Sequence, residues 1–320
     1  MTTSVALCTF NGEKFLRQQI DSILNQSMKV DEIVVCDDRS KDATIDILNG
    51  YQKKYPSVFK IYQNESNLGS VKNFERAVSL CSNEIIFLSD QDDFWIENKV
   101  EVILNYFALH PEINVVATNG YGIDEDNNEL KVYALWDIPR FLREKRIEVN
   151  YFHLIAFSGN IATGASMALR KEFLSSTIPF PVINGFHHDE WIALIAASKN
   201  SFEMLNDKLF KYRVHANQQV GEVFFDATEE MKNIVIRHFD YHINHKDFRS
   251  FKRILKRISN SYKKNRELSK EENYMKIGEE INVDLKKLYF KHKAEMFRLH
   301  PIRSTLLHFS DSVLNKRKLK

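Results

Sequence analysis

Three carboxylates lie within four residues of this chain. Asp90, Asp92 and Asp93 directly follow the apolar run Ile85–Ser89 (IIFLS), and Gln91 lies among them. Carboxylates this close repel one another unless a positive charge lies between them, and a divalent cation with oxygen ligands is a natural one. Mg²⁺ or Mn²⁺ would take one or two of these carboxylates and complete its shell with water and phosphate oxygens. The alternative is a solvated acidic turn.

Polar residues also end two other apolar runs. Ser4–Thr9 leads to Asn11, and Glu32–Cys36 leads to Asp38. If these runs are parallel strands, their carboxyl ends meet at one edge of the sheet, which is where open α/β sheets bind ligands. We therefore expect one site built from all of these side chains. The chain has neither G-x-x-x-x-G-K-[ST] nor G-x-G-x-x-G, which argues against a P-loop NTPase and a Rossmann dehydrogenase.

The elements that position these residues follow from the alternation of apolar runs and helical spacing. Short β-branched or apolar runs predict strands, and apolar residues three or four apart predict helices between them. Such an alternating order predicts a parallel sheet with helices on both faces. The predicted strands are Ser4–Thr9, Glu32–Cys36, Phe59–Tyr62 and Ile85–Ser89, and the predicted helices are Phe15–Asn25, one that starts at Asp42, and Gly69–Cys81.

Composition places the chain among folded globular proteins. Its 320 residues are 43 % hydrophobic and 28 % charged, which excludes collagen-like and disordered classes. Cys8, Cys36 and Cys81 lie in or beside apolar runs, so we expect reduced thiols in the core of a cytoplasmic protein. The N-terminus lacks the pattern of a signal peptide, and no apolar run reaches the roughly 20 residues that span a membrane.

The charge is divided unevenly along the chain. Residues 231–320 hold 23 Lys and Arg but only 10 Asp and Glu, a balance of +13, whereas the residues before them have a balance of −11. Strand patterns also stop near Phe225, after which the sequence predicts helices throughout. We therefore expect an α/β domain over residues 1–225 and a basic helical region over residues 226–320.

Several segments in order resemble a known family. CTFNGEKFLRQQIDSILNQS, EIVVCDDRSKDAT, NLGSVKNFERA and IIFLSDQDDFW resemble the bacterial inverting glycosyltransferases of family 2, which have the GT-A fold. The later segments TGASMALR, HHDEW and YRVHANQQVG resemble the rhamnosyltransferase-like branch. The resemblance covers roughly residues 3–222. It implies a GT-A nucleotide-diphospho-sugar transferase fold, a mainly parallel sheet flanked by helices, to which a C-terminal helical extension is added.

The resemblance also assigns roles to residues that match the family motifs. It implies that Asp92 and His215 hold Mg²⁺ or Mn²⁺, while other residues contact the nucleotide-sugar donor. Phe10 would lie against the base, although it could equally be a core residue, and Arg213 would pair with phosphate or with nearby acids. The donor-binding residues are Thr9, Phe10, Asn11, Glu13, Asp38, Asn67, Lys72, Asp90, Gln91, Asp92, Asp93 and Arg213.

The segment HHDEW matches the part of the family that carries the catalytic base. Inverting transfer needs a carboxylate to take the proton of the acceptor hydroxyl, and we expect Asp189 to be that base, with Glu190 as second candidate. The order Asp-Glu departs from the usual Glu-Asp, and an acid at a helix N-terminus is the structural alternative. Gly164, His188 and Trp191 are expected on the acceptor side.

The resemblance thus implies an enzyme that moves a sugar, rhamnose by its branch, from a UDP- or dTDP-linked donor. The acceptor would be a hydroxyl of a cell-surface polysaccharide such as O-antigen or capsule, or of a lipid-linked oligosaccharide. Two alternatives stay open. A sugar nucleotidyltransferase would carry a Gly-rich basic loop where this chain has TFNGEKF, and a glycan-binding or scaffold protein would have the fold without the chemistry.

The basic region after residue 225 suggests its own partner. Aromatic and aliphatic residues lie among its many Lys and Arg, a pattern that favours an anionic membrane surface on the inner face of the cell membrane. The alternatives are packing on the α/β domain and formation of a homodimer. Nucleic acid is not expected, because no known binding module accompanies the charge.

Overall fold

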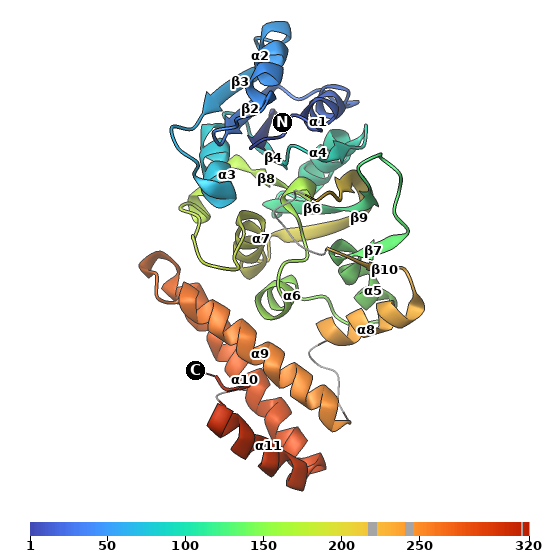
Figure 1. The fold of residues 1–320 in the computed structure, drawn as a ribbon, viewed down its shortest axis with the longest axis vertical. Coiled ribbons are helices and arrows are strands. Elements are labelled where there is room, and N and C mark those ends of the chain that lie inside the picture. The colour runs from blue at the N-terminus through green and yellow to red at the C-terminus, as the bar shows by residue number, and fades with distance from the viewer. Residues whose placement is uncertain (217–222, 241–245, 315, 320) are drawn as a thin grey trace. The chain divides into compact units, whose positions relative to one another are not determined.

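The computed structural model describes residues 1–216, 223–240, 246–314 and 316–319 (Figure 1). The chain divides into two compact units, here named the sheet unit and the helical unit. This division follows Ile234, whereas charge and pattern predicted a boundary near Phe225, which stays a proposal about domain organisation. The sheet unit comprises Met1–Tyr151, Asn160–Val182 and Phe186–Ile234, and the helical unit comprises Phe152–Gly159, Ile183–Gly185 and Val235–Lys320.

One eight-stranded sheet forms the centre of the sheet unit, with the strand order β3-β2-β1-β4-β8-β6-β9-β5. Its strands are β1 (Thr3–Thr9), β2 (Glu32–Asp37), β3 (Phe59–Gln63), β4 (Ile85–Ser89), β5 (Phe94–Trp95), β6 (Val115–Ile123), β8 (Ala168–Arg170) and β9 (Phe202–Arg213). A separate antiparallel pair consists of β7 (Val132–Ala134) and β10 (Phe224–Asp226).

The four predicted strands are confirmed as β1 to β4, and they pair in parallel. Every residue of β1, β2 and β4 is buried, as continuous apolar runs predict for strands covered on both faces. The other half of the sheet is mixed, because β8 pairs antiparallel with β4 and β6, and β5 pairs antiparallel with β9. The observed class is therefore a mixed sheet flanked by helices.

Helices cover both faces of this sheet (Figure 1). Predicted helices are confirmed as α1, α2 and α3, and each bound that was predicted lies within two residues of the observed one. Cys8, Cys36 and Cys81 are free and buried, as expected. The helices of the sheet unit are α1 (Leu16–Leu24), α2 (Thr44–Lys54), α3 (Gly69–Leu80), α4 (Lys99–Leu109), α5 (Ile138–Glu144) and α7 (His188–Ser198), with 3-10 turns η1 (Leu135–Asp137), η2 (Gly164–Ser166) and η3 (Lys171–Ser176).

The helical unit confirms that the basic region folds as helices. Its long helices α9 and α10 pack against each other through apolar faces, which include Leu255 and Ile258 of α9 and Leu285 and Tyr289 of α10. Helix α8 (Glu229–Phe239) joins the two units along the chain. The other elements are α6 (Tyr151–Ser158), α9 (Phe248–Leu268), η4 (Glu272–Tyr274), α10 (Met275–Leu299) and α11 (Pro301–Leu314).

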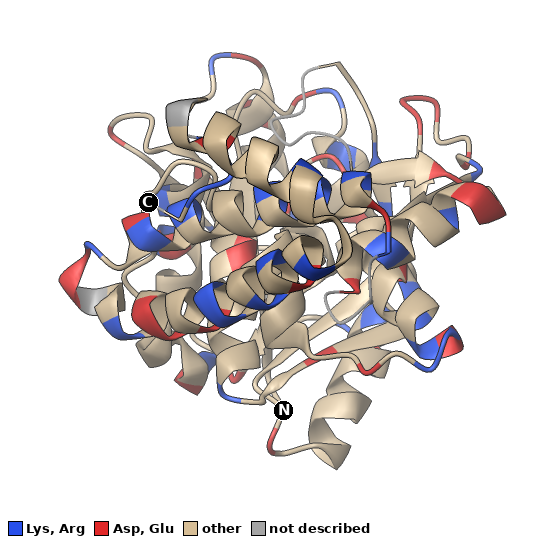
Figure 2. Ribbon diagram, turned by 90° about the horizontal axis from the view of Figure 1, so that it is seen from below, with Lys and Arg blue, Asp and Glu red and all other residues tan. Residues whose placement is uncertain are grey.

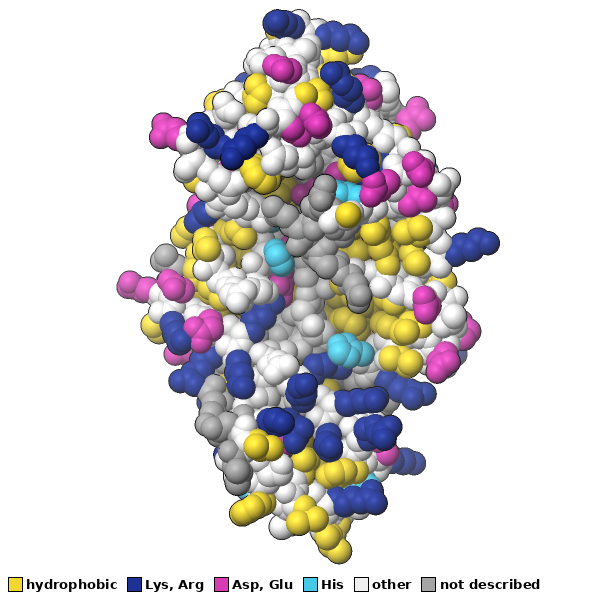
Figure 3. All heavy atoms as spheres, viewed as in Figure 1, with side chains coloured by type: hydrophobic (Ala, Val, Ile, Leu, Met, Phe, Trp, Pro, Cys, Tyr) yellow, Lys and Arg dark blue, Asp and Glu magenta, His cyan; other side chains and the backbone are white. Residues whose placement is uncertain are grey.

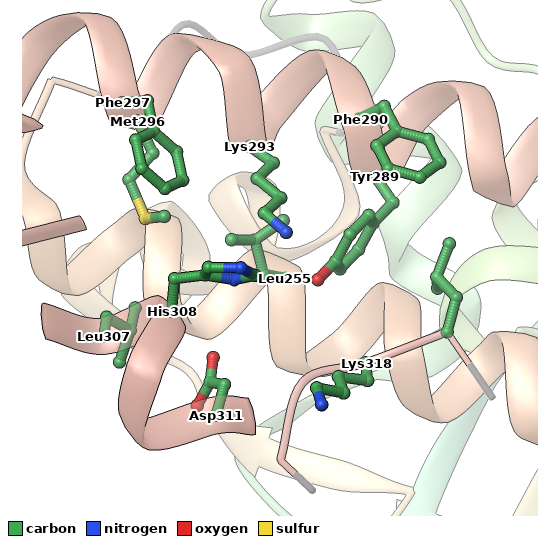
Figure 4. A pocket seen from close by; sticks show the side chains of 11 residues that line it. Leu255, Tyr289, Phe290, Lys293, Met296, Phe297, Leu307, His308, Asp311 and Lys318 are labelled. Atoms are coloured by element: carbon green, nitrogen blue, oxygen red, sulfur yellow. The ribbon is translucent and has the colours of Figure 1, made fainter. Parts of the chain in front are cut away.

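A cavity of about 240 Å³ lies inside the helical unit, between α9, α10, α11 and the C-terminal segment (Figure 4). Lys293 and Tyr289 line it from α10, His308 and Asp311 from α11, and Lys318 from the segment that follows. Helix α11 therefore borders a partly empty space on its inner side. Among the described residues, no helix has the length and apolar character that crossing a membrane requires.

Candidate active site

A cavity of about 450 Å³ opens at the carboxyl ends of the sheet strands in the sheet unit. Its wall brings together segments that are far apart in the sequence: the ends of β1 and β4, the turn before β8, the start of α7 and the end of β9. The predicted site residues that line it are Thr9, Phe10, Asn11, Asp38, Asp90, Gln91, Asp92, Asp93, Gly164, His188, Asp189, Arg213 and His215.

The two predicted metal ligands meet in this wall. Asp92 precedes β5 and His215 follows β9, and antiparallel pairing of these strands brings the two residues together. His215 Nε2 lies 2.9 Å from Asp92 Oδ2. A carboxylate oxygen beside an imidazole nitrogen is a donor set that suits Mn²⁺. No cluster of three or more His, Cys, Asp or Glu that could hold a metal occurs within the described residues, so the fit is to a cation that takes two protein ligands.

Two further acids of the same run lie in this wall, Asp93 buried and Asp90 half-buried. Asp93 Oδ1 accepts a hydrogen bond of 3.0 Å from the backbone N–H of Arg213, and buried Asp93 Oδ2 has no hydrogen-bond partner among the described residues. Burial raises the pKa of Asp90 to about 8, and the charge of Asp92 adds to the shift. Burial likewise raises the pKa of Asp93, again with Asp92 contributing. The solvated acidic turn is therefore not what the chain forms here.

Lys99 is a member of this environment that the sequence analysis missed. Its side chain is fully buried at the start of α4, and Nζ donates a hydrogen bond of 2.5 Å to the Ala165 carbonyl. Burial lowers the pKa of Lys99 to about 7, while the charges of Asp93 and Asp90 act in the opposite direction. A lysine among the buried apolar positions of α4 is the sequence signal that could have identified it.

The Arg213 guanidinium donates hydrogen bonds to backbone and side-chain oxygens of the protein. Nε donates to the Asp92 carbonyl at 2.8 Å, Nη1 to the Asp124 carbonyl at 3.0 Å, and Nη2 to Gln18 and Asn127 side-chain oxygens at 2.7 and 2.8 Å. The guanidinium also lies over the Phe15 ring, 4.5 Å from its centre. These contacts hold the Asp92 backbone in place, and the pairing of Arg213 with phosphate stays a prediction. The sequence predicts a short strand that ends before Lys211, whereas the structure has residues 211–213 at the end of the 12-residue strand β9.

The predicted base lies in the first turn of α7. The apolar run over residues 192–197 predicts a helix there, and the observed helix α7 begins earlier, at His188, with His187 at the N-cap. Asp189 Oδ2 accepts from the Gly164 backbone N–H at 3.1 Å, and Oδ1 accepts from the Glu190 backbone N–H at 2.6 Å. An acid in this position is stabilised by the helix dipole, and the two N–H groups orient its carboxylate in the cavity wall.

His188 lies beside this carboxylate and is nearly enclosed. Its ring stacks on Phe74, with ring centres 3.8 Å apart, and neither ring nitrogen has a hydrogen-bond partner among the described residues. Burial lowers the pKa of His188 to about 4, so the imidazole is neutral at neutral pH. A Cβ on Gly164 would lie 2.9 Å from His188 Nε2, so glycine is needed for this close approach.

Five predicted site residues do not line the cavity. Trp191 is buried and donates from Nε1 to the Thr177 carbonyl at 2.8 Å, which places it in the core. Glu13 accepts from the Ala43 backbone N–H at the start of α2, at 2.8 Å. Asn67 contacts the Asp38 carbonyl, Lys72 pairs with Glu75, and Glu190 is buried away from the cavity wall.

The predicted nucleoside end is formed by β1 and the loop after β2. Asp38 accepts from the Asn64 side chain and from the backbone N–H groups of Leu68 and Gly69, at 2.7 to 2.9 Å, and so holds the start of α3. Phe10 is exposed, and Gln91 bonds to both of its backbone groups. Further wall residues that the sequence analysis missed are Ser70, Asn73, Phe74, Leu135, Trp136, Asn160 and Tyr212. Asn217–Gly221 of the motif YRVHANQQVG lie outside the described residues.

Comparison with known proteins identifies the enzyme class that the sequence motifs resemble. The family model described as Glycosyl transferase family 2 matches residues 4–176, more than half of the chain. An uncharacterized glycosyltransferase of Methanocaldococcus jannaschii is 29 % identical over 214 residues, 66 % of this chain and 70 % of the relative. The dTDP-rhamnosyl transferase RfbG of Shigella flexneri is 26 % identical over 227 residues, 67 % of this chain and 73 % of the relative.

The fold also matches solved structures. S. aureus TarS 1–349, solved in complex with UDP, superposes with a TM-score of 0.52 at 16 % identity, covering 93 % of this chain and 91 % of that one. At this identity the likeness concerns the fold alone. That fold is the GT-A type that the sequence predicts.

Proposed function

The chain belongs to glycosyl transferase family 2, and from this premise we propose that it transfers a sugar from a nucleotide-diphosphate donor to a hydroxyl of a glycan with inversion at the anomeric carbon. The observation that carries the proposal is the single cavity that contains the Asp92–His215 pair together with Asp189. The family accounts for the enzyme class, while the donor, the metal and the stereochemistry are proposals.

Asp189 acts as the base in this proposal. As the acceptor oxygen attacks the anomeric carbon, Asp189 takes the hydroxyl proton, the new carbon–oxygen bond forms, and the bond to the diphosphate oxygen breaks with its electron pair leaving on the diphosphate. The two N–H groups that orient the Asp189 carboxylate reduce the reorganisation needed during attack. Asp189 is favoured over Glu190 because only Asp189 lines the cavity.

Asp92 and His215 would hold Mg²⁺ or Mn²⁺ in the proposed enzyme. When bound, such a cation supplies charge stabilisation to the diphosphate leaving group. The chain's own residues prepare this position: Arg213 holds the Asp92 backbone, and Lys99 places a buried amino group near Asp90 and Asp93.

The donor is proposed to be linked to UDP or dTDP. The UDP-bound TarS structure and the dTDP-rhamnosyl transferase relative support these two nucleotides and, for the second, rhamnose. Phe10 and Asn11 at the end of β1 would contact the nucleoside, and Gly164 and His188 would contact the sugars from the other side of the wall. The acceptor is proposed to be a growing cell-surface polysaccharide or a lipid-linked oligosaccharide.

Calorimetric titration of UDP and dTDP, with and without Mn²⁺, tests the donor site. We expect binding that needs Mn²⁺ and that Asp92→Asn weakens at least about tenfold, because the substitution removes the only carboxylate of the pair. Asp207→Asn, at an exposed acid of β9 outside the cavity wall, is the matched control and should bind as the parent does. Metal-independent binding that is equal in both variants would contradict the proposal.

The basic region over residues 226–320 is proposed to hold the enzyme at the inner face of the cell membrane by attraction to anionic lipid. The balance of +13 over residues 231–320 supports this location. A homodimer is the competing use of the same region, and sedimentation velocity without lipid distinguishes the two.

A further inference from the structure

Helix α11 has an apolar face that no described residue covers. Ile302, Leu306 and Phe309 are 78, 68 and 72 % exposed. Their spacing of four and then three residues places all three on one side of the helix. Leu314, at the end of the same helix, is also exposed.

The opposite face of α11 already packs inside the helical unit. Ser304 and Asp311 are buried, and Leu307 and His308 line the cavity shown in Figure 4. The inner face of α11 is therefore mostly polar, and its apolar side chains Ile302, Leu306 and Phe309 lie on the exposed side. A surface helix of a globular protein normally buries its apolar stripe, so an exposed one indicates a further partner.

The charges around α11 indicate what that partner is. From residue 291 to residue 318 the chain has seven Lys and Arg but only two acids, Glu295 and Asp311. Both acids are already paired, with Arg298 and Arg317 respectively. Three of the remaining cations form no ion pair with any described residue and do not line the cavity between the helices: Lys291, Arg303 and Lys316.

Figures 2 and 3 show where Lys and Arg lie on the helical unit. Lys and Arg recur along its helices in Figure 2. In Figure 3, hydrophobic side chains appear at the end of the unit formed by α11, with Lys and Arg close to them. Apolar side chains flanked by uncompensated cations are the combination that binds at the surface of an anionic bilayer.

We propose that α11 lies in the interface of an anionic lipid bilayer, with Ile302, Leu306 and Phe309 at the boundary of the acyl chains and the neighbouring cations at the lipid phosphates. A second copy of the chain is a poorer occupant, because a symmetric contact would bring the unpaired cations of both copies together. This inference goes beyond charge attraction, since it assigns insertion to one helix face, and it does not depend on sugar transfer.

The first test compares two double variants of the full chain on sedimented vesicles. Leu306→Ser with Phe309→Ser should lower the partition coefficient onto phosphatidylglycerol-containing vesicles at least about tenfold, because two apolar side chains no longer enter the interface. Leu109→Ser with Val182→Ser removes equally exposed side chains, 77 and 71 % exposed, from the sheet unit and should bind as the parent does. Equal binding of both variants would overturn the inference.

The second test reports insertion directly and changes no charge. Phe309→Trp should be quenched by lipids with brominated acyl chains, whereas the same vesicles should leave the parent protein's buried Trp95, Trp136 and Trp191 unquenched. Absence of quenching on vesicles that bind the protein would overturn the inference. So would a lipid-free dimer that Leu306→Ser with Phe309→Ser dissociates while vesicle binding is unchanged.

Discussion

Asp189 has its carboxylate held by two backbone N–H groups, those of Gly164 and Glu190, at the start of α7. We predict that Asp189→Asn lowers the rate of sugar transfer about 10²- to 10⁴-fold, because the amide cannot take the hydroxyl proton. UDP affinity should stay within about twofold, since this residue is not part of the donor end. The measurement is transfer of labelled sugar to the acceptor fraction that the parent enzyme glycosylates.

Glu190→Gln is the matched control for this prediction. Glu190 is buried and does not line the cavity, so its substitution should leave transfer within about tenfold of the parent at equal folded protein. The reverse result, an inactive Glu190→Gln beside an active Asp189→Asn, would assign the base to Glu190.

His188 makes a prediction about stability and pH. Its pKa is about 4 in the folded protein, because of burial, but near 6.5 in the unfolded chain. The unfolded chain therefore binds a proton first as the pH falls, so stability from this group is present above about pH 6.5 and is lost between about 6.5 and 4. At about pH 5 the loss is roughly 2 kcal/mol.

The comparison that isolates this effect is urea unfolding of the parent and of His188→Leu at about pH 7.5 and about pH 5. Leu does not titrate, so the variant should lose about 2 kcal/mol less than the parent over this interval. The same pH dependence in both proteins would show that His188 takes up its proton in the folded state.

Two glycines within helices give opposite predictions at the scale of elements. A Cβ on Gly50 of α2 would meet nothing within 4 Å, so Gly50→Ala should raise the free energy of unfolding by about 0.5–1 kcal/mol through helix propensity. A Cβ on Gly278 of α10 would lie 2.8 Å from the backbone nitrogen of Ser269. Gly278→Ala should therefore lower the free energy of unfolding by about 1–3 kcal/mol.

Urea unfolding of the full chain, with helix content followed by circular dichroism, measures both glycine variants. If Gly278→Ala were as stabilising as Gly50→Ala, the contact between α10 and the segment after α9 would be looser than the structure shows.

Element prediction from the sequence succeeded where burial on both faces forces a continuous apolar run. Strands β1, β2 and β4 are of this kind, and the prediction placed them to within a residue. Strand β5 is two residues long and was not predicted, because so short a run carries no periodicity. The antiparallel pairing of β5 with β9 depends on contacts between distant segments, which one sequence does not display.

At the scale of the whole molecule, the net charge is negative over residues 1–230 and positive over residues 231–320. We predict that binding to phosphatidylglycerol-containing vesicles falls at least about tenfold between low salt and about 0.5 M salt, because salt screens the attraction of the basic region. Binding of UDP in the cavity of the sheet unit should change much less. Vesicle sedimentation across a salt series measures the first effect, and salt-independent binding would show that apolar contacts alone hold the protein.

The sequence could predict those parts of the candidate site whose residues lie close together along the chain. Asp90 to Asp93 follow one strand, and the family motifs marked Asp189 and His215 in order along the chain. What one sequence could not display is which side chains turn away, as Trp191 and Glu190 do, or which distant residue enters, as Lys99 does. Those outcomes depend on packing between elements rather than on spacing within one.

The pairing of β5 with β9 has a consequence for the timing of activity. Asp92 precedes one of these strands and His215 follows the other, so the cavity wall is complete only after about two thirds of the chain has been synthesised. A partly made or partly unfolded chain therefore cannot hold the donor as the finished one does. By linkage, donor at about 100 times its Kd would add about 2.7 kcal/mol to the free energy of unfolding. A bound nucleotide sugar would then stabilise only those molecules whose cavity wall is complete, and would raise the folded fraction of active enzyme in the cell.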